Sequence, residues 1–70
     1  MRVYIKLEYK EKVYRSRYQE LDGDEMETLE NLMQKITDGD ASRFQFENNN
    51  ETYYFGRNIL NESIITVIKE

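Results

Sequence analysis

Carboxylates dominate the middle of this 70-residue chain. Residues 20–40 hold eight Asp and Glu side chains against Lys35 alone, which gives the segment a local charge of −7. Solvated helices usually place lysine four positions after glutamate, which stabilises them by about 0.2–0.5 kcal/mol per pair. Repulsion that no cation relieves favours a protein partner with a basic surface, although an acidic face also serves solubility alone. The residues expected to contact this partner are Glu20, Asp24, Glu25, Glu27 and Glu30.

Basic and aromatic side chains gather instead near the N-terminus. Residues 1–19 hold six Lys and Arg against two Glu, a local charge of +4. Aromatic rings on a sheet can stack a base, and cations beside them can neutralise phosphate. Lys and Arg on an edge hairpin also discourage aggregation. The candidate ligand face comprises Tyr4, Lys6, Tyr14, Arg15 and Arg17. Because the whole chain carries a charge of −4 and has a pI near 4.8, we do not expect it to bind duplex nucleic acid.

Catalytic and metal-binding residue types are scarce. The chain has no Cys and no His, which excludes disulfides, Cys/His zinc sites and mechanisms that use a thiol or an imidazole. Its three glycines are too far apart for a phosphate-binding loop. Asp-Gly-Asp runs at 22–24 and 38–40 lack the ligand order of an EF-hand and match the signals that start and end a helix. We therefore expect no enzyme activity, no metal site and no cofactor.

Length limits the core that the chain can form. A domain of this size buries only about 60–65% of the surface of its unfolded chain, and no disulfide is present to compensate. Oligomerisation is one remaining source of stability, so a structural homo-oligomer is a further expectation. No apolar run approaches the roughly 18–20 residues that a membrane helix needs. We expect a cytoplasmic protein that does not contact membranes.

The elements that position these residues begin with a hairpin. Apolar and polar residues alternate over 2–9, with Val3, Ile5 and Leu7 on one face, as in a half-buried strand. The charged residues 10–12 interrupt this pattern. Alternation resumes over 13–19, which predicts a second, antiparallel strand.

A helix follows the hairpin. Its apolar stripe is formed by Met26, Leu29, Leu32, Met33 and Ile36. Asp24 is the expected N-cap, with Glu27 completing a capping box, and Asp22 is the other cap candidate. Gly39 suits the left-handed position that ends a helix.

The C-terminal part predicts three more strands. Residues 43–47 and 51–56 alternate around an Asn-rich turn at 48–50. Residues 57–62 suit a short helical turn that inserts Ile59 and Leu60 into a gap. Residues 63–69 carry apolar groups on both faces, as expected of a central or two-sided strand. The order β-β-α-β-β-β predicts an α+β fold, a single domain over 1–70, in which one helix packs on a twisted, mostly antiparallel sheet.

The stretch Tyr-Tyr-Phe-Gly-Arg-Asn-Ile-Leu-Asn-Glu-Ser-Ile-Ile-Thr-Val-Ile at 53–68 resembles the ending of small uncharacterised proteins encoded by phages and prophages of Gram-positive bacteria. The start of the first strand, at 3–9, and the acidic helix are similar in kind. This resemblance implies a phage origin and an accessory role, and it assigns no functional residues. Combined with the charge pattern, it leads us to expect a non-catalytic protein-binding module that modulates or inhibits a host protein. A small-ligand or nucleotide-binding protein is one alternative, and the structural homo-oligomer is the other.

Overall fold

The computed structural model describes all 70 residues and contains six strands and two helices. In chain order these elements are β1 (Arg2–Tyr9), β2 (Lys12–Arg15), β3 (Gln19–Glu20), α1 (Gly23–Thr37), β4 (Arg43–Asn48), β5 (Glu51–Gly56), α2 (Arg57–Glu62) and β6 (Ile64–Lys69). All strand pairs are antiparallel. The predicted α+β class is confirmed, and so are the single long helix and the short helical turn at 57–62.

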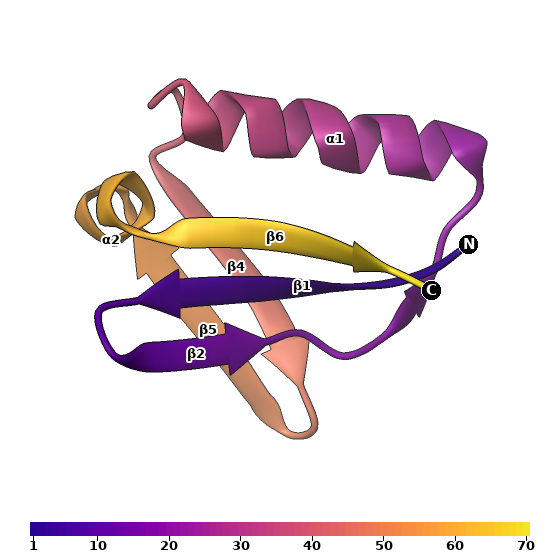
Figure 1. Cartoon of the computed structure of the whole chain (residues 1–70), viewed down its shortest axis with the longest axis horizontal. Coiled ribbons are helices and arrows are strands. Elements are labelled where there is room, and N and C mark those ends of the chain that lie inside the picture. Colours follow the sequence, from indigo (N-terminus) through magenta and orange to yellow (C-terminus); the bar gives the residue numbers. More distant parts are fainter.

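Strand β1 is the centre of a four-stranded sheet, with β6 on one side and β2 followed by β3 on the other (Figure 1). Side chains directly opposite each other in paired strands share a face. Residues two apart along a strand also share a face. One face, called the inner face here, carries Val3, Ile5 and Leu7 of β1, and all three are buried. The other face, the outer face, carries Tyr4 and Lys6 and is not covered by any helix or strand (Figure 1).

Strand β6 lies at an edge of this sheet. It pairs with β1 over six consecutive residues and with no other strand. Of the two alternatives expected for residues 63–69, a central or a two-sided strand, the central position is therefore wrong. The apolar residues on both faces are only partly covered, since Ile64 is 66% exposed and Ile65 to Ile68 are half-buried.

The predicted strand at 13–19 is interrupted. Lys6 pairs with Arg15 and Val3 pairs with Gln19, so two residues of β1 lie opposite three residues, 16–18. This is a β-bulge, in which one extra residue bends the strand and changes the face of the side chains that follow. The extra residue breaks the strand into β2 and β3.

Strands β4 and β5 form a second sheet rather than an extension of the first. This hairpin crosses behind the four-stranded sheet in Figure 1. A two-residue turn joins its strands, and Asn49 takes the left-handed conformation there, with a φ of 57°. The backbone N–H of Arg17, in the bulge, donates a 2.8 Å hydrogen bond to the carbonyl of Glu47 in β4. The bulge thereby connects the two sheets.

Helix α1 begins two residues earlier than expected. The N-cap is Asp22, not Asp24: the Asp22 carboxylate accepts from the N–H of Glu25 at 2.8 Å, and the Glu25 carboxylate accepts from the N–H of Asp22 at 3.0 Å. This start places Leu21 and Met26 at the two positions of a hydrophobic staple, which a start at Asp24 does not.

Helix α1 ends with a Schellman motif. The N–H of Gly39 donates to the carbonyl of Ile36 at 3.1 Å, and the N–H of Asp40 donates to the carbonyl of Lys35 at 2.9 Å. Gly39 has a φ of 79°, as predicted for the residue after the C-cap. Both Asp-Gly-Asp runs are therefore accounted for by helix start and stop chemistry.

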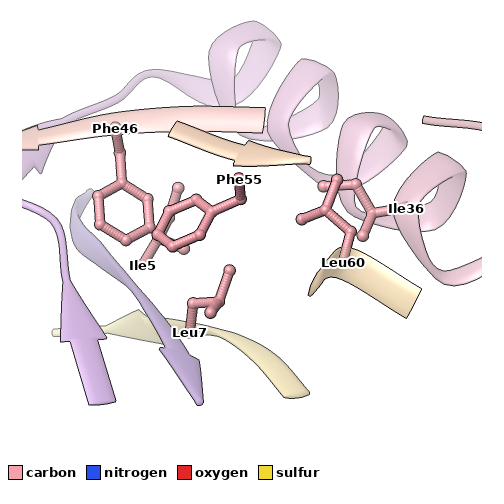
Figure 2. Close-up of a cluster of buried hydrophobic side chains, with 6 residues drawn as sticks. All are labelled: Ile5, Leu7, Ile36, Phe46, Phe55 and Leu60. Carbon is pink, nitrogen blue, oxygen red and sulfur yellow. The ribbon is translucent and has the colours of Figure 1, made fainter. Parts of the chain in front are cut away.

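The core lies between the inner face of the sheet, the hairpin and the two helices. Figure 2 shows Phe46 and Phe55 reaching from the hairpin toward Ile5 and Leu7 of β1. Ile36 of α1 and Leu60 of α2 close one end of the cluster (Figure 2). Met26 and Val3 are also buried. The predicted role of Leu60 as a plug for a gap is confirmed, since only 3% of it is exposed.

Candidate functional site

The acidic residues selected from the sequence are partly neutralised within the fold. Glu20 lies in β3, not on the helix, and its carboxylate is 2.9 Å from the N-terminal amino group of Met1. The carboxylate of Glu25 accepts a hydrogen bond from the backbone N–H of Asp22 in the capping box. The sequence interpretation had assumed that both carboxylates lack a partner. In the structure each of them has one.

Glu30 is also paired, with 3.3 Å between its Oε1 and the Nζ of Lys69 in β6. Asp24 and Glu27 are exposed on α1 and form no ion pair. Exposed pairs contribute little to stability, about 0–1 kcal/mol each, but they reduce the charge that a partner meets. The acidic surface is consequently smaller than the sequence indicated.

The candidate ligand residues are divided between the two faces of the sheet. Lys6 and Arg15 lie opposite each other on the outer face, with Tyr4 two residues along β1 on the same face. Tyr14 lies opposite Leu7 and therefore faces inward. Arg17 sits in the bulge, where its guanidinium is 3.8 Å from the carboxylate of Glu47.

The outer face also contains an aromatic pair that the alternating pattern did not predict. Tyr18 is the last residue of the bulge, and its ring lies beside Tyr4, with centroids 5.0 Å apart and planes at 69°. The guanidinium of Arg2 stands 4.1 Å from the centroid of the Tyr18 ring. A hydrogen bond to the carboxylate of Glu70 raises the pKa of the Tyr18 phenol above its usual value of 10, with desolvation as a smaller cause.

A shallow hollow of about 290 Å³ opens beside this pair. We call it the bulge hollow, and its lining consists of Tyr4, Arg15, Ser16, Tyr18 and Asn48. Two of the five residues proposed for the ligand face therefore meet here. The other lining residues come from the bulge and from the end of β4, which no local sequence signal brings together.

The largest concavity, about 630 Å³, lies at the end of the molecule where the β1–β2 turn meets β5 and α2, on the left of Figure 1. We call it the tyrosine groove. It is lined by Tyr9, Lys10, Glu11, Lys12, Tyr14, Tyr53, Tyr54, Phe55 and Ile59. Its volume falls within the roughly 300–1,000 Å³ of typical ligand sites, and its walls are mainly aromatic, as in such sites.

Aromatic packing makes one wall of this groove rigid. Tyr14 meets Tyr53 and Phe55 edge to face, with centroids 5.4 and 5.5 Å apart, and these two rings stack on each other at 6.4 Å. The phenol of Tyr53 donates a 2.8 Å hydrogen bond to the carboxylate of Glu51. This bond is the main reason that the pKa of Tyr53 lies above 10, with desolvation again a smaller cause.

The rim of the groove is charged and open to solvent. Lys10 and Lys12 flank Glu11 in the β1–β2 turn, and all three are exposed. The ammonium of Lys10 stands 5.2 Å from the centroid of the Tyr9 ring. Tyr54 is 73% exposed, which makes it the most exposed large apolar residue. The groove offers apolar walls to a flat or branched group, and two ammonium groups to a carboxylate or phosphate beside it.

Sequence reasoning missed the tyrosine groove because its residues come from two distant segments, 9–14 and 53–59. Only Tyr14 had been selected, and for the opposite face. The alternation of Tyr53 and Phe55 indicated a strand, not a site.

No group of three or more acidic side chains is placed to hold a metal ion. Neither helix has the length and apolar character needed to cross a membrane.

Comparison with protein-family models, with curated proteins and with solved structures finds no match to the chain. The resemblance to phage-encoded proteins therefore stays an expectation, and function has to be argued from the surfaces themselves.

Proposed function

We propose that this protein is a non-catalytic protein-binding module that holds a segment of its partner in the tyrosine groove. One observation carries the proposal: the largest concavity of the fold joins a rigid aromatic wall to a rim with two exposed lysines. Aromatic side chains supply large contact areas at low entropic cost and are enriched where proteins bind each other. The partner segment inserts an apolar side chain between the rings and places a carboxylate near Lys10 or Lys12.

This proposal keeps the class expected from the sequence, a modulator or inhibitor of a host protein, and changes the surface. Of the carboxylates on the acidic helix, only Asp24 and Glu27 have neither an ion pair nor a part in the capping box. The tyrosine groove, in contrast, buries a partner side chain on several sides. Burial of this kind is where hot-spot residues concentrate.

Selection from a random peptide library displayed on beads tests the proposal. We expect enriched peptides that combine an aromatic or aliphatic anchor with a neighbouring Asp or Glu. The variant Tyr54→Ala combined with Lys12→Glu should weaken their binding at least tenfold, since it removes one wall and reverses one rim charge. Both positions are exposed, so the fold should not change.

The matched control is Tyr18→Ala, which removes an exposed tyrosine from the opposite face of the sheet. It should leave peptide binding unchanged. A second control, Asp24→Lys with Glu27→Lys, tests the acidic helix. Enrichment of basic peptides that this helix variant no longer binds would transfer the proposed function from the groove to the helix. Absence of any enriched sequence would overturn the protein-binding proposal.

A further inference from the structure

The bulge hollow is separate from the tyrosine groove and has a rigid frame. The hydroxyl of Ser16 accepts a 2.8 Å hydrogen bond from the N–H of Ile5 and donates a 2.9 Å bond to the carbonyl of Arg17. The side-chain amide of Asn48 donates a 2.9 Å bond to the carbonyl of Arg15. These bonds fix the backbone that carries the lining side chains. Bulges are frequent beside functional sites because they redirect a side chain.

The redirected side chain is Tyr18. Without the extra residue, regular alternation would place positions 15 and 18 on opposite faces of the sheet. With it, Tyr18 and Tyr4 meet at 69° on the outer face and form a corner rather than a flat wall. Arg2 covers one side of the Tyr18 ring, at 4.1 Å from its centroid. The corner therefore presents aromatic surface that a planar group can stack on.

Cationic and polar groups surround this corner. Arg15 is exposed and forms no ion pair, unlike Arg17 and Lys6, which lie 3.8 and 3.5 Å from carboxylates. Its guanidinium is therefore available for bidentate binding of an anion. The Oδ1 atom of Asn48 accepts no hydrogen bond from the protein and is available to a donor on a ligand.

We propose that the bulge hollow binds a nucleoside monophosphate, with its base stacked at the Tyr4–Tyr18 corner and its phosphate held by Arg15. The volume of about 290 Å³ is just below the roughly 300–1,000 Å³ of typical ligand sites, which suits one small ring system and one phosphate rather than a longer nucleotide chain. Stacking on tyrosine tolerates any base because every base has a π-face. Selectivity should therefore depend on the phosphate more than on the base.

Titration of the ¹⁵N-labelled protein with uridine monophosphate, followed by NMR, tests this site. We expect saturable shifts of the backbone amides of residues 15–18 and of Asn48. Uridine, which lacks the phosphate, and inorganic phosphate, which lacks the base, should each bind at least tenfold more weakly. High salt should weaken binding, because the phosphate contact is at the surface.

Two variants should each weaken binding by about tenfold: Arg15→Ala removes the charged hydrogen bonds, and Tyr18→Ala removes a stacking surface. Arg17→Ala is the matched control and should bind as the wild type does, because Arg17 does not line the hollow. Tyr18→Phe should also retain binding, because it keeps the aromatic ring on which the base stacks.

Several results would overturn the proposal. One is the absence of saturable shifts. Another is binding of inorganic phosphate as tight as that of uridine monophosphate. A third is an equal loss of binding in Arg15→Ala and Arg17→Ala, since that would indicate general attraction to positive charge. The peptide-binding experiment on the tyrosine groove is independent of all three.

Discussion

The backbone N–H of Ile5 donates its hydrogen bond to the side-chain hydroxyl of Ser16, at 2.8 Å, and not to a carbonyl of the neighbouring strand. In return, the N–H of Ser16 donates to the carbonyl of Ile5, also at 2.8 Å. Ser16 is 5% exposed and is the one buried polar residue of the chain. A single hydroxyl thus replaces the acceptor that the bulge removes from the sheet.

Replacing this hydroxyl should destabilise the fold. Ser16→Ala leaves the N–H of Ile5 buried without an acceptor, and an unsatisfied buried group of this kind costs about 1–3 kcal/mol. Urea denaturation monitored by circular dichroism measures the loss. Ser42→Ala is the matched control, because Ser42 is exposed, and it should change stability by less than about 0.5 kcal/mol. Equal stability of the two variants would show that the bulge does not depend on the hydroxyl.

The two glycines at the ends of α1 should respond oppositely to alanine. Gly39 has a φ of 79°, a conformation that costs a residue with a Cβ about 1–2 kcal/mol. Gly23 has helical backbone angles and open space around the site of a new Cβ. Gly39→Ala should therefore lower the midpoint of thermal unfolding, and Gly23→Ala should raise it by restricting the unfolded chain, a gain of about 0.4–1 kcal/mol. A stabilising Gly39→Ala would contradict the Schellman assignment.

Local patterns account for the features that the sequence predicted correctly. The apolar stripe and the left-handed Gly39 define α1 from residues within a few positions of each other. The hairpin of β4 and β5 likewise needs only alternation and an Asn-rich turn. Even the error at the helix start is local, because Asp22 and Asp24 are each followed three residues later by a glutamate.

The features that the sequence did not predict depend on contacts between distant residues. Nothing near Ser16 in the chain indicates that it bonds to Ile5, so the bulge and the exchange of faces at Tyr18 could not be predicted. The tyrosine groove requires that residues 9–14 lie beside residues 53–59, which only the packing of hairpin on sheet establishes. The edge position of β6 was missed for a related reason. A β-branched run indicates a strand, but its coverage depends on which neighbours pack against it.

The two faces of the sheet should differ sharply in their tolerance of truncation. Leu7 has no exposed surface and packs in the cluster of Figure 2, so Leu7→Ala should cost about 2–5 kcal/mol. Ile64 is 66% exposed on the outer face, and Ile64→Ala should cost less than about 0.5 kcal/mol. Urea denaturation of both variants provides the comparison. Similar losses would mean that the outer face is covered in solution, for example by a second copy of the chain.

The raised pKa of the Tyr53 phenol predicts that the protein loses stability at alkaline pH. Its hydrogen bond to Glu51 raises its pKa above 10 in the native state, so the native protein binds this proton more tightly than the unfolded chain does. The resulting stabilisation is complete below pH 10 and is lost as the pH rises through the raised pKa. Glu51→Gln removes the carboxylate charge and should bring the ionisation of Tyr53 back toward pH 10. Ultraviolet absorbance of the phenolate, measured against pH, should then show one tyrosine fewer that ionises late, while Tyr18 keeps its raised pKa through Glu70. Superimposable titration curves for the wild type and Glu51→Gln would show that the Tyr53–Glu51 bond does not persist in solution.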